Sequence, residues 1–492
     1  MSLNHRYNVE SVTNELKASE KHDFIASYAG RLSVALVYPN LYSLGMSNLG
    51  FLTVHRLVSS VKGIGVERFF PALLPEKPLE APYYSFETGR PLGDFDIIMF
   101  SFSFEGDFDK IPGLFASLGF PVLASERNKR HPVLIAGGAA IASNAPALSL
   151  IFDILIPGEA ENTIIPLLNI IKEDGFDKEK IASLQGIWVP SLTKEVPTLC
   201  GIHNVDFSPA YSHIVSSKNA FGGAHIIEVM RGCPRCCSFC LARAIYSPPR
   251  PVSLNTIENW LNNRPNCKDL GLVAPSLFDH PQVEDIFNLL AERKINVRNS
   301  SVKWEKLTPN IINALRKSGI KSLTIAPETG SEKLRQAIHK PLNEERFLTK
   351  INELFSNDFE HIKMYFVTCM PNENETDIDD TVALIEKVLK KAPSFSSISA
   401  TFSIFVPKHH TPWANEKAPE QYTIKKRLKY LKSQLGKLPA QFKANFESPQ
   451  DATRQAYLAQ VGPELGEIYS QEAKECRKER LFSKNQFTAL EF

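Results

Sequence analysis

Strands and helices alternate along two long stretches of this chain, and this alternation limits the folds open to it more than any other feature. In the first stretch, within residues 1–175, the sequence predicts buried strands at RLSVALVYP, GVERFF, FDIIMFSFS, VLIAGG and FDILIPG. Helical patterns occur at Met46–Val61 and Glu161–Ile171. We therefore expect an α/β domain with an open, mostly parallel sheet covered on both faces, whose ligands bind at the carboxyl ends of the strands.

The second stretch, residues 225–412, follows a connector at 176–224 and repeats the alternation six times. Its strand-like segments are HIIEVM, DLGLVAP, NVRNSSV, SLTIAPE, HIKMYFVTCMP and SSISATFSIFVP. Six such units predict a partial barrel with its active site at the carboxyl ends of the strands. Residues 413–492 are charged and mostly helical in pattern, so we expect a small C-terminal extension.

Length and charge narrow the class of protein without identifying it. A chain of 492 residues predicts two or three domains, and a formal net charge of +2 neither favours nor excludes a nucleic-acid or membrane partner. The sequence contains no run of 18 apolar residues, so we expect no transmembrane helix. The polar N-terminus does not look like a signal peptide. Four cysteines are scattered along the chain, unlike a secreted disulfide framework, so we expect a reducing, cytoplasmic location.

The other four cysteines fall in the segment RGCPRCCSFC, directly after the first strand of the second stretch. Cys233, Cys237 and Cys240 have the spacing Cys-x3-Cys-x2-Cys. Three thiolates on such a loop can hold three irons of a four-iron cluster and leave the fourth iron open. Zinc is the competing metal, but structural zinc sites usually use two cysteine pairs separated by a longer loop. The spacing therefore favours iron and sulfur.

This loop, with Phe239 before its last cysteine, resembles the signature of the radical S-adenosylmethionine (SAM) enzymes. Together with the PPR that follows it, the loop looks like the cluster loop of members with an N-terminal cobalamin-type domain. The segments LTIAPETGSEKLR, MYFVTCMPNENETD and FVPKHHTPW are similar to the fourth, fifth and sixth strands of their TIM-type (β/α)6 barrel. Upstream, YPNLYSLGMSNLG, SFSFEGDF, AGGAAIASNAP and IPGEAE resemble the branch with a Rossmann-like, cobalamin-binding-like domain before the barrel. The resemblance runs from about residue 30 to residue 413.

The resemblance implies both cofactors and a reaction. Cys233, Cys237 and Cys240 would bind a [4Fe-4S] cluster, and the cluster would cleave SAM reductively. The resulting 5′-deoxyadenosyl radical would abstract a hydrogen atom from an unidentified substrate. Cys236 stands where this branch usually has glycine, and we interpret it as a tolerated neighbour of the cluster because three ligands complete such a site.

Other residues are weaker candidates for cofactor binding. The resemblance places Glu328 and Ser331 near SAM, although Ser331 would also be a good helix N-cap. Ser300 and its neighbour Ser301 would either line the SAM pocket or be hydrogen-bonded serines of the core. In the second strand, Ala274-Pro275-Ser276 replaces the Gly-Gly-Glu-like turn of the family, so no side chain is assigned there.

Two aromatic or imidazole features have ordinary structural interpretations as well as functional ones. The pair His409–His410, after the sixth strand, would face the substrate or lie in an exposed loop, and the exposed loop is the better interpretation. Tyr365 is expected to pack in the core or the pocket wall, as aromatic residues on barrel strands usually do.

The first domain departs from cobalamin domains at the position that matters most. Its LYSLGMSNLG segment contains no histidine where those domains supply the lower cobalt ligand, and His55 has the wrong flanking residues. Gly137 and Gly138 resemble the turn that lets the backbone approach the cobalamin tail, although such glycines also serve ordinary turns. Either cobalamin binds without a protein ligand to cobalt or the domain has lost it, and we expect weak binding or none.

The substrate is not readable from the sequence and could be a small molecule, a peptide or an RNA. The resemblance implies an electron donor such as flavodoxin or ferredoxin. Two alternatives remain beside the radical SAM enzyme described above. One is a cobalamin-dependent radical SAM methyltransferase, and the other is a non-catalytic iron–sulfur scaffold or redox sensor.

Overall fold

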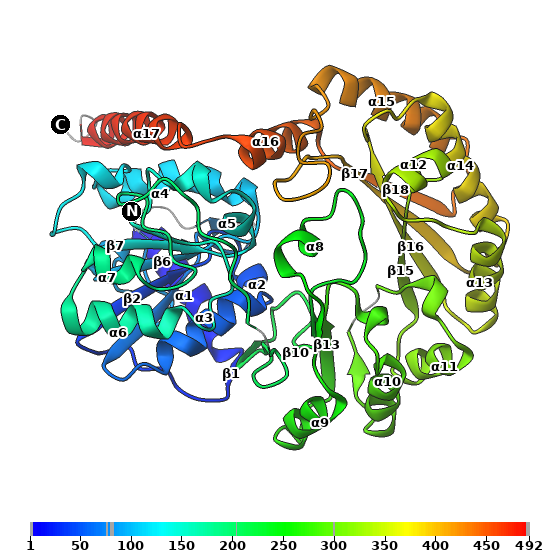
Figure 1. Cartoon of the computed structure of the whole chain (residues 1–492), viewed down its shortest axis with the longest axis horizontal. Coiled ribbons are helices and arrows are strands. Elements are labelled where there is room, and N and C mark those ends of the chain that lie inside the picture. The colour runs from blue at the N-terminus through cyan, green and yellow to red at the C-terminus, as the bar shows by residue number, and fades with distance from the viewer. Residues whose placement is uncertain (1–2, 75–76, 79–82, 203, 299–300, 489–492) are drawn as a thin grey trace. The chain divides into compact units, whose positions relative to one another are not determined.

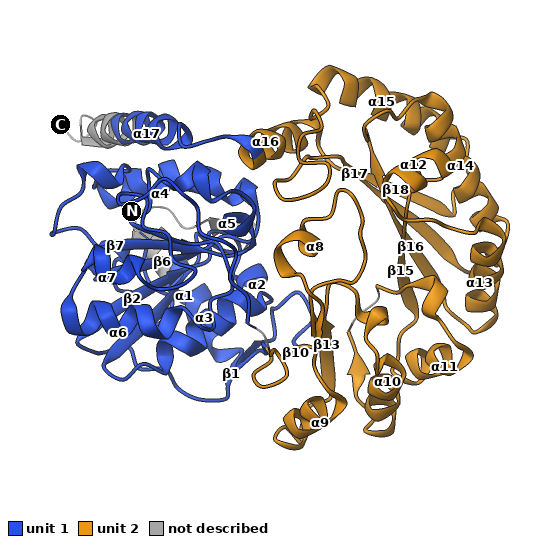
Figure 2. Cartoon of the chain, in the orientation of Figure 1, with its two compact units in different colours: residues 1–203, 210–223, 460–492 blue, residues 204–209, 224–459 orange. Residues whose placement is uncertain are grey.

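The computed structural model of the chain (Figure 1) describes residues 3–74, 77–78, 83–202, 204–298 and 301–488. The chain divides into two compact units, which Figure 2 shows in different colours. Unit 1 comprises Met1–His203, Ala210–Gly223 and Gln460–Phe492, and unit 2 comprises Asn204–Pro209 and Ala224–Ala459. One candidate SAM contact, Ser300, lies outside the described residues.

The core of unit 1 is a five-stranded parallel sheet in the order β3-β2-β6-β7-β8. Its strands are β2 (Leu32–Val37), β3 (Ile64–Phe69), β6 (Ile97–Ser101), β7 (Val133–Gly137) and β8 (Ile154–Ile156). Each coincides, within two residues at either end, with a predicted segment, so the expected Rossmann-like sheet is confirmed. The strand order reverses between β2 and β6, and ligands of such sheets bind at the carboxyl ends of the strands beside that reversal.

Helices surround this sheet, and two of them begin three residues after the predicted positions. Helix α3 (Leu49–Ser59) starts where the Asn48 side chain accepts the backbone N–H of Phe51 at 2.9 Å, which satisfies an otherwise unpaired donor. The remaining helices are α1 (Leu3–Ala18), α2 (Tyr42–Gly45), α4 (Ile111–Leu118), α5 (Ala139–Asn144), α6 (Ile164–Asp174), α7 (Lys178–Ala182) and α17 (Leu465–Thr488). The C-terminal helix α17 packs on α4, where the Tyr469 hydroxyl donates to Asp109 at 2.7 Å.

Two antiparallel strand pairs complete unit 1. Strand β1 (Glu20–His22) pairs with β9 (Ile214–Ser216), and β4 (Ala72–Leu74) pairs with β5 (Lys77–Pro78). Because β9 lies in the segment Ala210–Gly223, its pairing with β1 ties that segment to the start of the chain.

Unit 2 is a series of parallel strands in chain order, which is the expected partial barrel. A three-stranded sheet, β10-β13-β14, is joined to a four-stranded sheet, β15-β16-β17-β18, by a parallel bridge between Ser301 and Thr324. The strands are β10 (His225–Glu228), β13 (Asp269–Val273), β14 (Asn296–Val297), β15 (Ser322–Glu328), β16 (His361–Thr368), β17 (Ser397–Ile404) and β18 (Phe442–Phe446). The first six match predicted strands, whereas β18 lies in the segment predicted to be helical.

Helices follow the strands of unit 2, and polar side chains mark where several of them begin. At α14 the Asn374 side chain accepts the N–H of Asp377 while the Asp377 carboxylate accepts that of Asn374, a reciprocal capping box. The helices are α8 (Leu241–Tyr246), α9 (Leu254–Asn262), α10 (Val283–Glu292), α11 (Pro309–Lys317), α12 (Glu332–Ala337), α13 (Glu344–Ser356), α14 (Glu375–Leu389), α15 (Gln421–Leu435) and α16 (Pro449–Gln460). Among the described residues, no helix is both long and apolar enough to cross a membrane.

Candidate functional site

The cysteine-rich segment is a loop that leaves the carboxyl end of β10. It begins after the short strand β11 (Met230–Arg231), which pairs with β12 (Arg250–Pro251) and so folds the chain back on itself. Between strand and loop, Gly232 has a φ of 82°, and a Cβ there would lie 2.4 Å from the Tyr246 carbonyl oxygen. Only glycine fits this close approach, which sets the direction in which the loop departs.

The second half of the loop is held against the ends of β15, β16 and β17. The Ser238 N–H donates to the carbonyl of Ile338 at 3.2 Å, and its hydroxyl donates to the carbonyl of Ala337 at 2.9 Å. The Trp413 N–H donates in turn to the Ser238 carbonyl at 3.1 Å. Next in the chain, Phe239 packs against the apolar cluster of Ile338, Met370 and Phe405. The loop therefore lies at the strand ends where a barrel places its site.

The first half of the loop is held from the other side, near the end of β13. Arg235 makes two hydrogen bonds to Asp279, at 2.8 and 3.0 Å, and Asp279 ends the short 3₁₀ turn η5 (Leu277–Asp279). The Ser276 hydroxyl donates to the same carboxylate at 2.7 Å, and Lys303 contacts it as well. Although burial alone would raise it, these hydrogen bonds hold the pKa of Asp279 well below its usual range.

The four thiols of the loop differ in exposure. Cys233, Cys237 and Cys240 are half-buried, whereas Cys236 is exposed. The Cys240 N–H donates to the Cys237 carbonyl at 3.2 Å, which makes a tight turn between these two residues. Burial raises the pKa of the Cys237 thiol, and the nearby Lys340 opposes this in part.

The donor set fits an iron–sulfur cluster in chemistry and placement. Three half-buried thiols lie on one loop, and the charges of Cys233 and Cys240 act on Cys237. Within the part of the chain that the structure describes, no three His, Cys, Asp or Glu side chains already form a metal-binding group. The fit therefore rests on the thiols and their shared loop, and not on a preformed metal geometry.

Of the candidate SAM contacts, Glu328 lies beside the cysteine loop. It ends β15 with a φ of 66° at an irregularity in the pairing with β16, and its carboxylate accepts a 2.7 Å hydrogen bond from Lys340. Both Glu328 and Lys340 act on the Cys237 thiol. A side chain other than glycine, aspartate or asparagine in the left-handed region is uncommon and marks a position that the surroundings hold in place.

The other serines are engaged within the protein. The Ser331 side chain caps α12 through the N–H of Leu334 at 3.4 Å and donates to Asp377 at 2.6 Å. Ser331 is fully buried, so both of these contacts are internal. Ser301 makes the bridge to Thr324 that joins the two sheets and has an exposed side chain. Ser276, in the turn after β13 where the sequence departs from the family pattern, donates a hydrogen bond to Asp279.

Sequence reasoning missed a charged group at the end of β16. The Glu373 carboxylate accepts the backbone N–H of Cys369 at 2.5 Å and the Thr368 hydroxyl at 3.2 Å. Burial raises the pKa of Glu373 to about 7, although Arg427 opposes the shift. Two residues of this turn, Cys369 and Asn372, have φ values of 61°. A five-residue turn with asparagine and proline was the available signal, but the cation that pairs with Glu373, Arg427, comes from a distant part of the chain.

The remaining candidates of the barrel are the His409–His410 pair and Tyr365. His410 is exposed in the loop after β17, with a φ of 64°, and His409 beside it is half-buried. Tyr365 is a half-buried residue of β16 whose ring lies 4.8 Å from the Lys363 ammonium.

In unit 1, the polar groups at the carboxyl ends of β2 and β6 are bound to one another. The Asn40 amide donates to Asp107 at 2.7 Å, and the Asn48 amide donates to the Ser103 hydroxyl at 2.8 Å. Burial raises the pKa of Asp107 to about 6, and the bond from Asn40 opposes the shift. His55 is buried in α3, with its Nδ1 atom 2.9 Å from Nε2 of His213.

The two candidate glycines of this edge have partners within the protein. Gly138 has a φ of 107°, and a Cβ on it would lie 2.4 Å from the Phe102 carbonyl oxygen. A Cβ on Gly137 would lie 3.4 Å from the Ile156 carbonyl oxygen. Gly138 is thus required by its positive φ and by the backbone after β6, whereas at Gly137 a Cβ would make an ordinary contact.

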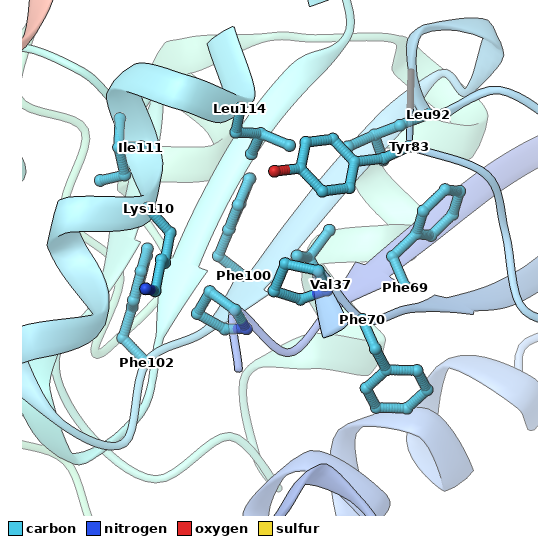
Figure 3. Close-up of a pocket in the computed structure, with 12 residues that line it drawn as sticks. Val37, Phe69, Phe70, Tyr83, Leu92, Phe100, Phe102, Lys110, Ile111 and Leu114 are labelled. Atoms are coloured by element: carbon cyan, nitrogen blue, oxygen red, sulfur yellow. The ribbon is translucent and has the colours of Figure 1, made fainter. Parts of the chain in front are cut away.

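The same edge encloses a small apolar crevice (Figure 3). Side chains from β2, β3, β6 and α4 line it, among them Val37, Phe69, Phe100 and Leu114. Its volume is about 20 Å³, which is room for a single water molecule. This crevice by itself has no room for a corrin ring, and weak or absent cobalamin binding stays a prediction.

Comparison with known proteins gives matches to both units. Residues 50–190 match the family model for the N-terminal part of radical SAM proteins, and residues 227–385 match that of the radical SAM superfamily. The uncharacterized protein MJ0966 of Methanocaldococcus jannaschii is 29% identical over 417 residues, which cover 82% of this chain and 84% of that protein.

Two solved structures share the fold at low sequence identity. The radical SAM methyltransferase TsrM from Kitasatospora setae, with its tryptophan substrate and a SAM analog, aligns at a TM-score of 0.55 and 13% identity, covering 78% of this chain and 75% of that one. The cobalamin-dependent radical SAM enzyme OxsB, with aqua-cobalamin and SAM bound, aligns at 0.50 and 14% identity, covering 72% and 52%. With both family matches, the chain belongs to the radical SAM superfamily of enzymes and resembles its branch with an N-terminal cobalamin-binding-like domain.

Proposed function

We propose that Cys233, Cys237 and Cys240 hold one [4Fe-4S] cluster and that this site binds SAM for radical chemistry. When bound, the cluster supplies the electron for reductive cleavage of SAM, which yields a 5′-deoxyadenosyl radical for hydrogen abstraction from the substrate. The observation that carries the proposal is the cysteine loop itself, which has three half-buried thiols and lies at the strand ends of the barrel.

The surroundings of the loop support this role. Phe239 and the apolar cluster of Ile338, Met370 and Phe405 pack behind the last cysteine and exclude water from that side. The exposure of Cys236 indicates that it is not a cluster ligand, because such a ligand is usually shielded from solvent.

Among the side chains of unit 2, Glu328 is our candidate for a direct contact with SAM. Its carboxylate lies beside Cys237 and is held by Lys340, so a charged pair stands next to one of the proposed cluster ligands. Ser331 remains a weaker candidate, since its hydroxyl is already bonded to Asp377. We keep Ser300 as a candidate on the resemblance alone.

A cobalamin-dependent radical SAM methyltransferase is the second candidate function. The fold shared with TsrM and OxsB favours it. The strand edge of unit 1 weighs against it, because its asparagines and glycines are already engaged and its crevice is small. A non-catalytic iron–sulfur scaffold or redox sensor is the third candidate function. The match to the radical SAM superfamily and the fold shared with TsrM and OxsB weigh against it.

Reconstitution with iron and sulfide under anaerobic conditions tests the proposal. We expect one four-iron cluster per chain and, with dithionite and SAM, release of 5′-deoxyadenosine and methionine. Stoichiometric zinc, or a reconstituted cluster that leaves SAM intact, would contradict the proposed function. About eight irons per chain would instead indicate a second cluster.

We further propose that the enzyme works in the cytoplasm with a flavodoxin or ferredoxin as electron donor. All eight cysteines are free thiols, and a low-potential cluster needs a protein reductant in a reducing compartment. A pull-down with either donor, followed by SAM cleavage without dithionite, checks this part of the proposal.

A further inference from the structure

The cysteine loop is attached to unit 2 at two separate places, and the charged attachment has no role assigned so far. Ser238 and Phe239 fasten the half that carries Cys240 to the ends of β15–β17. On the other half, Arg235 follows Cys233 by two residues and forms two hydrogen bonds to Asp279.

Asp279 is the fixed partner in this contact. Its side chain is only 7% exposed, whereas that of Arg235 is 45% exposed. Besides the two bonds from Arg235, its carboxylate accepts from the Ser276 hydroxyl at 2.7 Å and contacts Lys303. Its own N–H donates to the Ser276 carbonyl at 3.1 Å, which holds the backbone of the turn. Asp279 is thus anchored on the barrel while the arginine reaches to it from the loop.

The surrounding charges make the Asp279 carboxylate necessary for this attachment. Asp279 carries one negative charge between two cations, Arg235 and Lys303, so its removal would leave two like charges facing each other. A bidentate contact between arginine and carboxylate is also the strongest and most directional ion pair available to a side chain. Neutralising Asp279 therefore removes the attachment and adds repulsion at the same position.

We propose that Asp279 is a positioning residue that fastens the Cys233 half of the loop to the end of β13. It acts through Arg235 and sets where the Cys233 thiol stands relative to Cys237 and Cys240. This inference rests on the proposed function, in which Cys233 is a cluster ligand. It also accounts for the Ala274-Pro275-Ser276 departure, since Ser276 supports the carboxylate that the loop arginine needs.

The attachment is testable in the cluster-free protein by the rate at which each thiol reacts with iodoacetamide. Trypsin cuts after Arg231, Arg235 and Arg243, so Cys233 is recovered alone on residues 232–235. Cys240 is recovered on residues 236–243 together with Cys236 and Cys237, and fragmentation of this peptide assigns the label to Cys240. In Asp279→Asn we expect Cys233 to react roughly tenfold faster, because a lost charged hydrogen bond opens the loop locally. The rate at Cys240 should stay unchanged, since Ser238 and Phe239 hold that half independently.

A matched control removes another ion pair of the same sheet. Asp269 is half-buried at the start of β13 and pairs with Arg298 at 2.6 Å. Asp269→Asn should leave the rates at both cysteines as they are in the wild type. If Asp279→Asn does not fold, Arg235→Gln removes the same contact from the loop side, and peptide fragmentation then assigns the labelled cysteine.

Equal acceleration at Cys233 and Cys240, or none at either, would overturn the proposal. Iron uptake by the wild type, measured in parallel, separates this failure from failure of the proposed function. A wild type that binds no iron contradicts the cluster assignment alone. A wild type that binds iron, together with uniform alkylation in Asp279→Asn, contradicts only the role of Asp279.

Discussion

Both units alternate parallel strands with helices, but the residues at the carboxyl ends of their strands differ. In unit 2, a loop with three half-buried thiols lies at the strand ends and is held from two sides. In unit 1, the corresponding edge between β2 and β6 is closed by hydrogen bonds between its own side chains, such as Asn40 with Asp107. The edge of unit 2 carries thiols that could bind a metal, whereas polar side chains at the edge of unit 1 bond to one another.

The difference teaches that strand edges of the same kind can differ in how far their polar groups are already bound within the protein. A parallel sheet places turns and helix starts at its carboxyl edge whatever the sequence, so the architecture alone implies no ligand. What separates the units is the chemistry and the commitments of a few side chains. Each prediction below alters one side of that contrast.

The largest effect is expected from the cysteines of unit 2. Cys233→Ala, Cys237→Ala and Cys240→Ala should each lose the cluster and all SAM cleavage, because three thiolates are the whole protein ligand set. Cys236→Ala, a matched control on the same loop, should keep the cluster and most of the activity. Iron content and 5′-deoxyadenosine release measure both outcomes. A variant pattern with Cys236 essential and one of the others dispensable would reverse the ligand assignment.

A smaller but clear effect is expected at the start of the loop. Gly232→Ala places a Cβ 2.4 Å from a carbonyl oxygen at a positive φ, so it should destabilise the loop by about 1–3 kcal/mol or more and reduce cluster uptake. Gly319→Ala is the control, since it also has a positive φ but its nearest contact is at 3.5 Å. Hydrogen exchange of the peptides around residue 232 should rise in Gly232→Ala only. Equal exchange in both variants would show that the close approach is unimportant.

An acid-dependent effect is expected in unit 1. Burial lowers the pKa of His213 to about 3, with Arg56 adding to it, and burial likewise lowers the pKa of His55 well below its usual range. The unfolded state binds protons near pH 6.5 and the folded state does not, so stability is lost as pH falls from there. Each histidine contributes up to about 1.4 kcal/mol per pH unit.

The variant His213→Phe sharpens this point. It preserves the stacking on Phe24, whose ring lies 5.0 Å from that of His213, and removes one titrating group. Its unfolding free energy should therefore depend less steeply on pH than that of the wild type between about pH 6 and about pH 4. Urea unfolding at several pH values gives the two slopes. Identical slopes would mean that His213 does not titrate on unfolding.

The smallest expected effect concerns cobalamin, which should bind weakly or not at all. After incubation with hydroxocobalamin and desalting, the visible spectrum should show less than stoichiometric corrin. Any cobalt that does bind should lack a protein nitrogen ligand, because the loop after β2 has no histidine and His55 is paired with His213 in the core. A stoichiometric corrin with histidine nitrogen coupling in the Co(II) paramagnetic resonance spectrum would erase the contrast between the two units.

Much of the fold was predictable because its signals are local. Buried strands such as β2 and β6 are continuous apolar runs, and α14 has both a cap and a helical period in sequence. Strand β18 was missed because its five residues, FKANF, form a short segment with no fully buried residue in a charged, helical context. Its strand state depends on pairing with β17, which lies far away in the sequence. Local propensity cannot report such a pairing.

The sequence by itself determined the spacing of the thiols, and the tertiary structure decided which other residues surround them. Thiolate spacing is a property of the chain, so the cluster motif could be read directly. That Arg235 meets Asp279, that Glu328 stands beside Cys237, and that Gly138 packs on Phe102 depend on contacts between segments far apart in sequence. Glycines and polar side chains have the same letters whether they face a ligand or a neighbouring strand, and only the packed fold distinguishes these cases.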